Sequence, residues 1–368
     1  MHQPPLLDEI EWSEPISARA VPPPLDPELA RQAKAEFGGV PPFMSRFAAC
    51  PWAVRMMMRF RWPQFAYISH RLADLILLVV SQDSSCRYCY GNARTYLRLT
   101  GQSETRIRQL ETDFQQSDLP EQHRLALEFA RLVARASPRP GRAEAAALTN
   151  AGVTSQEAAE IATYATYCVL ATRIATLVAV PPSPTEKLVG RWFSPMFRVV
   201  LELEGRKHRR QIPPQPLPAH AIATPPMSAL FRHLDGLPLA SLLYRALTES
   251  LQSKILPRRT KLLLWAVVAR ALQCTTCEAG CRTLIAEEGI IEDEFNEVLQ
   301  RLHSRGLTPL EAKLVPIARE TTRYVPAAIQ AKIRGLAAEI RDEELVEFVA
   351  ITALSNAMAR LTVVLDCP

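Results

Sequence analysis

The chain has 368 residues, of which 48% are hydrophobic and 22% charged, and its formal net charge is +5. The length is sufficient for two domains with separate cores, and the composition is typical of globular proteins. The small, mixed charge argues against nucleic-acid binding. The first residues lack the basic flank and apolar core of a secretion signal, and the apolar runs near Leu75 and Leu262 are too short to span a membrane. We therefore expect a cytoplasmic protein that binds neither nucleic acid nor membrane.

Residues 1–40 are expected to form a proline-rich N-terminal arm that contains one helix. Asp26 supplies a helix cap and Pro27 a first-turn proline ahead of the run LARQAKAEF. The rest of the arm has no periodic apolar pattern, so we expect it to be irregular.

Beyond the arm, the sequence repeats itself. Offsets of 188 and 187 residues relate pairs of identical residues: Cys86 and Cys274, Cys89 and Cys277, Gly101 and Gly289, Glu160 and Glu347. A nearly constant offset of this kind indicates two copies of one structural unit. We place the two copies at residues 41–183 and 226–368.

The joint between the copies covers residues 184–225. Its many prolines favour an extended, semi-rigid linker. The basic run from Arg206 to Arg210 is interpreted as a solvated surface.

Within each copy the patterns predict helices. Arg71–Val80 and Lys261–Ala271 are apolar runs of helical length without internal proline or glycine. Thr154 and Glu157 form a capping-box pattern ahead of a long helix that ends near residue 179, and its counterpart covers about 342–365. No alternating strand pattern is present, so we expect an all-α protein with six or seven helices per copy.

The two CxxC pairs are the motifs most indicative of chemistry. Cysteines in a chain without a secretion signal indicate catalysis, redox chemistry or metal binding. A thioredoxin-type site needs a preceding strand, whereas both pairs follow helical runs. A structural zinc site needs four ligands, which neither copy supplies alone, although the pairs could share an ion and Cys281 could extend a cluster. Simple packing of small buried side chains is the third alternative.

We favour a redox dithiol. Two cysteines three residues apart at the start of a helix share one face, close enough for a disulfide. The partial positive charge of the helix N-terminus favours the thiolate and lowers its pKa. Such a thiolate can attack a peroxide, become a sulfenic acid and condense with its neighbour, after which a partner thiol reduces the disulfide.

Three segments of each copy carry a resemblance to a known family. In the first copy they are LADLILLVVSQDSSCRYC, FARLVA and GVTSQEAAEIATYATYCVLATRIA, and in the second LLLWAVVARALQCTTC, IARET and DEELVEFVAITALSNAMARL. They resemble the carboxymuconolactone decarboxylase superfamily, and within it the alkylhydroperoxidase D branch. The resemblance implies two tandem all-helical domains forming an internal pseudo-dimer, further homo-oligomers, and a thiol peroxidase or disulfide reductant without a cofactor.

The same resemblance implies roles for the cysteines. In this family the second cysteine of the pair meets the peroxide and the first resolves it. The corresponding peroxidatic residues here are Cys89 and Cys277, and the resolving residues are Cys86 and Cys274.

The chain departs from the family in its proton relay, which uses a glutamate before the pair and a histidine after it. In the first copy these positions hold Asp74 and Ala93, and in the second they hold Leu262 and Cys281. Asp74 is thus the one candidate relay carboxylate, although an ordinary ion-paired helix residue would fit as well. His70, one turn earlier, either pairs with Asp74 or is a surface histidine.

The remaining cysteines receive simpler interpretations. Cys281 lies one turn after Cys277, so it is either a third exchanging thiol or a packing residue. Cys50, Cys168 and Cys367 are interpreted as packing or terminal residues.

The functional hypothesis is a thiol-dependent peroxidase or disulfide reductase with a degenerate proton relay. Its activity would be weak or confined to one copy, its substrate a peroxide, and its partner a thiol or dithiol reductant or a redox protein. Two alternatives remain: a non-catalytic redox-sensing or interaction protein, and a lyase that acts on a lactone, as in the decarboxylase branch.

Overall fold

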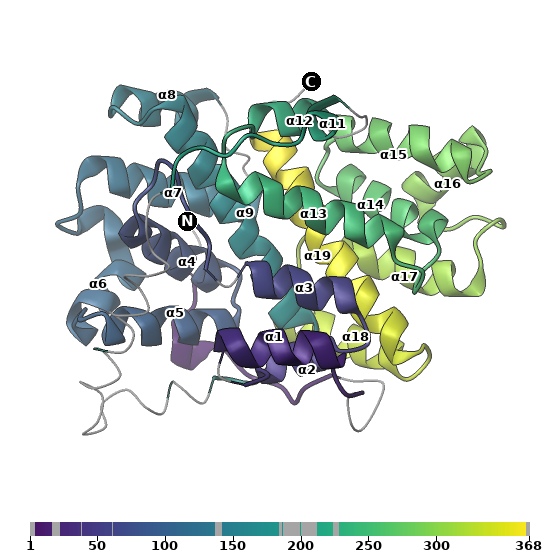
Figure 1. Ribbon diagram of the computed structural model, residues 1–368, viewed down its shortest axis with the longest axis horizontal. Helices are drawn as coiled ribbons and strands as arrows, with labels where there is room; N and C mark the ends of the chain where they lie inside the picture. Colours follow the sequence, from purple (N-terminus) through teal and green to yellow (C-terminus); the bar gives the residue numbers. More distant parts are fainter. Residues whose placement is uncertain are drawn as a thin grey trace. The chain divides into compact units, whose positions relative to one another are not determined.

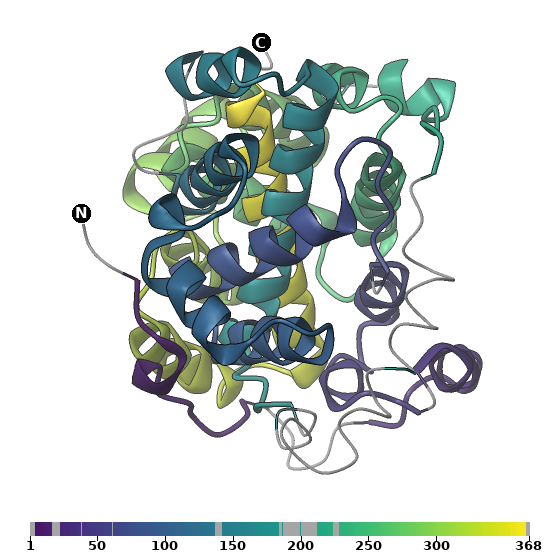
Figure 2. The same cartoon turned by 90° about the vertical axis from the view of Figure 1, so that its left-hand side faces the viewer.

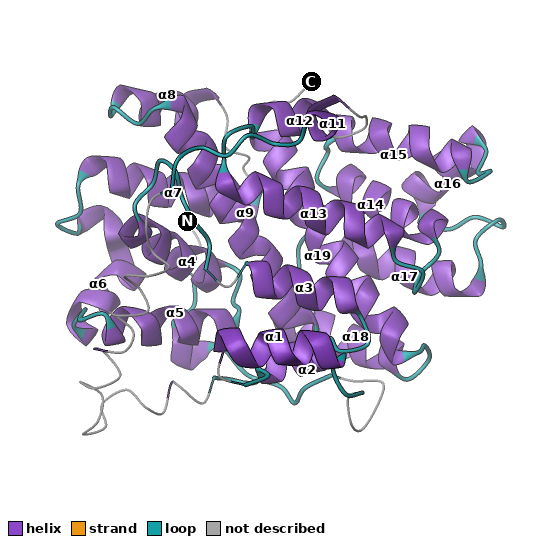
Figure 3. Ribbon diagram, viewed as in Figure 1, coloured by secondary structure: helices purple, strands orange, loops and turns teal. Residues whose placement is uncertain are grey.

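The computed structural model is helical. It describes residues 4–16, 23–37, 39–60, 62–136, 142–183, 186, 199, 212–223 and 228–365. Within these ranges helices are the regular structure, no strand is present, and one isolated bridge pairs Gln215 with Gly236 (Figure 3). The predicted all-α class is therefore confirmed. The basic run 206–210, most of the predicted linker and Cys367 lie outside the described residues.

The chain divides into two compact units, each of which is made from several segments. Unit 1 comprises residues 1–14, 62–215 and 236–239, and unit 2 comprises 15–61, 216–235 and 240–368. The division differs from the predicted one near the N-terminus, because most of the arm and residues 41–61 belong to unit 2. Contacts within unit 2 explain this membership: Trp52 donates to Glu347, and Arg46 pairs with Asp342 at 3.0 Å.

Unit 1 contains the helices of the first CxxC pair. Their bounds are η1 Leu7–Glu9, α4 His70–Asp83, α5 Arg87–Leu99, α6 Glu104–Asp113, η2 Phe114–Gln116, α7 Glu121–Arg135, α8 Arg142–Asn150 and α9 Ser155–Leu177. Helix α9 is rich in apolar residues, is buried along most of its length, and packs against α4, α5, α7 and α8 (Figures 1 and 2). A helix of this composition belongs in a core, and α9 forms the centre of unit 1.

Unit 2 contains the helices of the second pair. Their bounds are α1 Pro27–Phe37, α2 Pro42–Arg46, α3 Pro51–Arg59, α11 Ala219–Ala223, α12 Ser228–His233, α13 Pro238–Gln252, α14 Arg258–Ala271, α15 Thr275–Glu287, α16 Glu292–Arg301, α17 Pro309–Glu320, α18 Pro326–Ala337 and α19 Asp342–Val364. Helix α13 begins with two residues that belong to unit 1. Helix α19 packs against α14, α15 and α18 and takes the central place that α9 has in unit 1.

Among the described helices, α19 is the one whose length and composition would allow it to span a membrane. Its most apolar window is 94% buried. Length and composition alone are weak evidence for a span, because the buried core helix of a large domain has both.

The helix bounds repeat with the offset found in the sequence. A shift of 188 takes α4, α5 and α6 onto α14, α15 and α16 at both ends, and a shift of 187 takes α9 onto α19. The unusual backbone repeats too, since left-handed Ser85 (φ 48°) corresponds to Gln273 (φ 54°). The nearly constant offset therefore relates helix bounds and backbone conformation as well as residue types.

The predicted capping box at α9 is present. Thr154 Oγ1 accepts the Glu157 N–H at 3.2 Å, and the Glu157 carboxylate accepts the Thr154 N–H at 2.7 Å. We expect Thr154→Ala to lower the free energy of unfolding by about 1 kcal/mol. Exposed Ser155, whose hydroxyl donates to the neighbouring Gln156 side chain at 3.0 Å, provides the control. Equal shifts of the urea midpoint for Thr154→Ala and Ser155→Ala would contradict the capping role.

Candidate active site

In unit 1 a tight reversal brings Cys86 to the start of α5. Ser85 adopts a left-handed conformation after α4, and the Cys86 N–H donates to the Ser81 carbonyl at 3.1 Å. Cys86 thereby becomes the N-cap residue, and its Sγ accepts the Cys89 N–H at 3.5 Å. Serine, threonine, aspartate or asparagine usually accepts this bond. The reversal therefore places a sulfur at the positive end of a helix.

Unit 2 builds the same turn. Gln273 is left-handed, the Cys274 N–H donates to the Ala269 carbonyl at 2.8 Å, and Cys274 caps α15. Its Sγ accepts the Cys277 N–H at 3.4 Å. Both pairs thus have the helix-start geometry that the sequence predicted.

All four CxxC cysteines are buried, and none forms a disulfide bond. The exposed fraction is 1% for Cys86 and 8% for Cys89, compared with 2% for Cys274 and 0% for Cys277. Within each pair the two side chains lie on the first turn of one helix, so a disulfide needs little backbone movement. Cys89 is the most exposed of the four and is the thiol a small oxidant reaches most easily.

Hydrogen bonds make the two thiols of the unit 1 pair unequal in acidity. Burial raises the pKa of Cys86, but hydrogen bonds from the Cys89 thiol, the N–H groups of Cys89 and Tyr88 and the Thr176 hydroxyl outweigh burial, and the pKa of Cys86 is lowered. The pKa of Cys89 is raised well above its ordinary value, because its proton is held by Cys86 and because it is buried. Of the two thiols, Cys86 is therefore the more acidic one, and Cys89 the less acidic one.

This asymmetry predicts how alkylation depends on pH. A thiol with a lowered pKa keeps its reactive thiolate as the pH falls below the ordinary thiol range, whereas a thiol with a raised pKa loses it. With limiting iodoacetamide at neutral pH, we expect Cys86 to be labelled before Cys89, as measured by peptide mass spectrometry. Preferential labelling of Cys89 over Cys86 at neutral pH would show that Cys89, and not Cys86, is the more acidic thiol.

Unit 2 holds its pair with different neighbours. Cys277 Sγ donates to Thr362 Oγ1 of α19 at 3.4 Å, and the pKa of Cys277 is raised well above its ordinary value by its hydrogen bond to Cys274 and by burial. Cys281 is 3% exposed, and its pKa is also raised, by burial and by the charges of Cys274 and Glu278. Cys277 and Cys281 therefore remain protonated beside Cys274.

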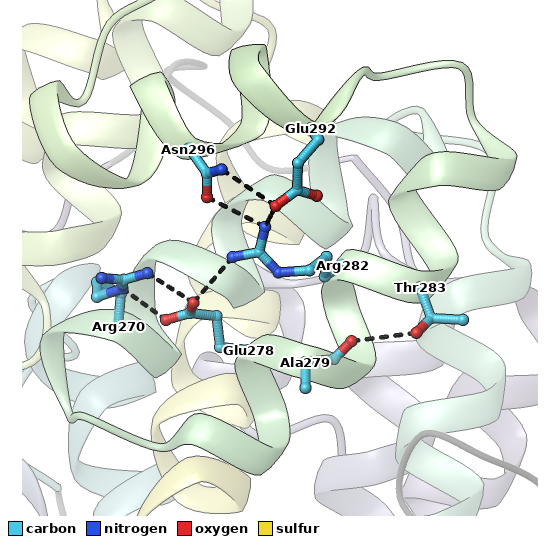
Figure 4. A network of polar contacts seen from close by, with 7 residues as sticks. All are labelled: Arg270, Glu278, Ala279, Arg282, Thr283, Glu292 and Asn296. Atoms are coloured by element: carbon cyan, nitrogen blue, oxygen red, sulfur yellow. Dashed lines mark hydrogen bonds and ion pairs between the residues drawn. The ribbon is translucent and has the colours of Figure 1, made fainter.

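Glu278, which directly follows Cys277, belongs to a polar network of unit 2 (Figure 4). Its carboxylate accepts two bonds from Arg270, at 2.5 and 2.6 Å, and one from Arg282 at 3.2 Å. Arg282 continues to Glu292 and to Asn296 Oδ1, the latter at 3.0 Å. The positive charges of Arg270 and Arg282 thus compensate the negative charge of Glu278, which directly follows the second dithiol in the chain.

The predicted relay positions are only partly polar in the structure. Asp74 is half-buried on α4, and its charge contributes to raising the pKa of Tyr164 on α9. Ala93 and Leu262 are 3% and 2% exposed and have no proton to transfer. His70 is half-buried, and its ring packs edge-on against Phe65 at 5.0 Å.

Two acidic residues near the motifs are structural. Asp83, three residues before Cys86, is 2% exposed at its side chain and pairs with Arg131 at 3.2 Å and with Arg135. Glu160 is fully buried and accepts the N–H groups of Ala66, Tyr67 and Ile68 at 2.7–2.8 Å. Both carboxylates hold segments of unit 1 together.

The sequence interpretation missed residues of the central helices. Thr362 of α19 accepts a hydrogen bond from Cys277 Sγ at 3.4 Å. On α9, Cys168 adds its charge to the bond with Cys86 and the burial that raise the pKa of Cys89. The available signal was polar side chains spaced by multiples of four in an otherwise apolar helix.

Among the described residues, no group of three or more histidine, cysteine, aspartate or glutamate side chains is arranged to hold a metal ion. Comparison with family models, curated proteins and solved structures finds no match. Fold and site together define an all-helical protein with a buried CxxC dithiol at a helix N-terminus in each unit. The resemblance to alkylhydroperoxidase D rests on the sequence motifs alone.

Proposed function

We propose that the protein is a thiol-dependent peroxidase or disulfide reductase, built from two tandem domains of the alkylhydroperoxidase D type. The observation that carries the proposal is the unit 1 pair, in which the Cys86 sulfur caps α5 and accepts the Cys89 N–H. A buried pair used only for packing has no need of one thiol that hydrogen bonds make more acidic than its neighbour.

Unit 1 is proposed to use both cysteines in one cycle. The Cys86 thiolate takes the proton of Cys89, and the resulting Cys89 thiolate attacks the peroxide. The O–O bond breaks, Cys89 becomes a sulfenic acid, and the alkoxide leaves as an alcohol after gaining a proton. The Cys86 thiol then attacks the Cys89 sulfur, which forms the disulfide and releases water. A thiol or dithiol reductant restores both thiols by exchange.

This cycle reconciles the family's roles with the observed hydrogen bonds. Cys89, with an exposed fraction of 8%, meets the peroxide, while Cys86, at 1%, serves first as the base and then as the resolving thiol. Asp74 is proposed to accept or return protons through the polar side chains of α9, because its charge acts on Tyr164.

Unit 2 is proposed to be a disulfide exchanger with little peroxidase activity. Leu262 and Cys281 stand at its relay positions, and both are buried. Positioned acid–base groups are typically worth about 10²–10⁴-fold in rate. Without them a dithiol can still exchange with another disulfide, since that reaction needs only a thiolate and access.

Peroxide consumption with dithiothreitol as the reductant tests this proposal. The wild-type chain should consume hydrogen peroxide or cumene hydroperoxide, or reduce a disulfide substrate, faster than a chain with Ser at Cys86, Cys89, Cys274 and Cys277. Cys50→Ser serves as the control, because Cys50 is buried and lies outside both motifs. If the fourfold variant retained the activity of the wild type in both assays, the proposed function would be wrong.

A further inference from the structure

Thr362 of the central helix α19 lies against the second dithiol. It is 1% exposed, and its Oγ1 accepts the thiol proton of Cys277 over an Sγ–Oγ1 distance of 3.4 Å. The same hydroxyl donates to the Met358 carbonyl of its own helix at 2.8 Å. A hydroxyl has one proton and two lone pairs. Because its proton is directed at Met358, Thr362 faces the sulfur with a lone pair, and Cys277 is the donor.

Two contacts from different elements therefore hold Cys277. Its backbone N–H donates to Cys274 Sγ at 3.4 Å within the first turn of α15, and its thiol is bound by α19. Both sulfurs are buried, with exposed fractions of 0% for Cys277 and 2% for Cys274. Cys277 is thus positioned to react inside the protein, with the sulfur three residues before it.

Unit 1 has an alanine at the position of this hydroxyl. The offset of 187 that relates α19 to α9 takes Thr362 onto Ala175. The two CxxC turns are otherwise built alike, with a left-handed residue, an N-cap cysteine and the same bond from a backbone N–H to sulfur. The hydroxyl is therefore a difference between the two dithiols and not a requirement of the turn.

We propose that Thr362 is a positioning residue that makes Cys277 the resolving thiol of unit 2. This inference rests on the proposed function, in which unit 2 exchanges its dithiol with a disulfide substrate. When Cys277 gives up its proton, the Thr362 hydroxyl turns from Met358 and donates to the charged sulfur, which stabilises it. The bond to Cys274 and burial raise the pKa of Cys277, and the Thr362 hydroxyl acts against both.

The exchange begins at Cys274, because this N-cap sulfur accepts an N–H that stabilises its thiolate. The thiolate attacks one sulfur of the substrate disulfide, the S–S bond breaks, and the first substrate thiolate takes up the proton lost by Cys274. The Cys277 thiolate then attacks the Cys274 sulfur and breaks its bond to the substrate. The second substrate thiolate takes up the proton lost by Cys277. The dithiol loses two electrons and the substrate gains two, so no further reagent is needed.

Trapping with glutathione tests this role in the full-length chain. The reduced protein is mixed with excess oxidised glutathione, quenched with acid at intervals, alkylated and mapped by peptide mass spectrometry. In the wild type we expect glutathione on Cys274, which the Cys274–Cys277 disulfide then replaces. Thr362→Val keeps the shape of the side chain and removes the hydroxyl. The mixed disulfide should therefore persist about fivefold longer, the equivalent of one net hydrogen bond, and Thr362→Ser should restore the wild-type lifetime.

The pH profile separates this role from simple packing. Closure of the disulfide should accelerate as the pH rises, and in Thr362→Val the acceleration should begin at a higher pH, because the Cys277 thiolate has lost a donor. Thr352→Val is the matched control, because Thr352 is 0% exposed on the same helix and its hydroxyl donates to the Phe348 carbonyl at 2.8 Å. Its profile should match the wild type, and so should that of the unit 1 pair in every sample.

If Thr362→Val does not fold, as judged by its thermal melt, Thr362→Ala replaces it, since alanine is the residue of unit 1 at this position. Equal lifetimes and pH profiles for the hydroxyl-free variant and the wild type would overturn the inference while the proposed function stands. Glutathione on Cys277 in place of Cys274 would overturn it in the same way. If the wild type forms neither a glutathione adduct nor a disulfide at Cys274, the proposed exchange activity of unit 2 fails with it.

Discussion

Lys261→Met is expected to lower the free energy of unfolding by about 3–5 kcal/mol, the range for removing one partner of a buried charge pair. Lys261 is 0% exposed in unit 2, and its Nζ donates to the carbonyls of Ser250 and Ser253 at 2.6 and 2.5 Å. These carbonyls lie at the C-terminal end of α13, where a cation is favourable. Glu347, also 0% exposed, lies 3.9 Å from the same Nζ. Methionine fills the space but leaves the carbonyls and the carboxylate without the cation.

Chemical denaturation followed by circular dichroism measures this loss. Lys313→Met is the matched control, because Lys313 is 42% exposed and pairs with Glu339 at 2.9 Å on the surface of the same unit. An exposed pair contributes about 0–1 kcal/mol. Equal effects of the two substitutions would show that the buried ammonium does not hold α13 in place.

Cys89→Ser is expected to reduce peroxide consumption about 10²-fold or more, while Cys277→Ser retains most of it. The two residues occupy equivalent places at the starts of α5 and α15. Their surroundings differ, because unit 1 has Asp74 and the polar face of α9, whereas unit 2 has Leu262 at the relay position. The expected difference is the typical contribution of positioned acid–base groups, about 10²–10⁴-fold.

The assay is the initial rate of hydroperoxide loss at saturating dithiothreitol, with thermal melts to confirm that both variants fold. Cys281→Ser removes the third thiol of unit 2 and leaves its CxxC pair intact. We expect it to leave the rate of hydroperoxide loss unchanged. Equal losses for Cys89→Ser and Cys277→Ser would mean that unit 2 is as active as unit 1, and that the relay argument is wrong.

Local features of this chain were predictable from its sequence. The helix starts at Cys86 and Cys274, the capping box at Thr154 and the long central helices depend on residues close together in the chain. Capping, periodicity and turn chemistry act over this range, so residue type and spacing are sufficient to predict them. The offset between the copies was found by matching residue types at a fixed spacing, which requires no knowledge of contacts in the fold.

Contacts between distant segments were not predictable in this way. The assignment of residues 15–61 to unit 2 depends on partners such as Arg46 with Asp342 and Trp52 with Glu347, almost 300 residues apart. The burial of Lys261 follows from the carbonyls at the end of α13, which no local pattern reveals.

Part of the candidate site depends on contacts that the sequence does not reveal. The bond from Cys277 to Thr362 of α19 joins residues far apart in the chain, so no local pattern predicts it. The assignment of Cys168 to packing stays a prediction, and the residue is fully buried in α9. The resemblance assigns the peroxidatic role to the second cysteine of the pair, Cys89. The capping bonds, which only coordinates show, favour Cys86.

The central claim is that each unit holds two neighbouring sulfurs that link and separate reversibly. The most direct test counts the thiols of the denatured chain, which has eight cysteines, before and after one equivalent of peroxide, and then maps the bonds. The account predicts that thiols disappear in pairs, that Cys86 is recovered linked to Cys89, and that dithiothreitol restores the full count. A full count of thiols after peroxide, or single cysteines oxidised while both CxxC pairs stay reduced, would contradict it.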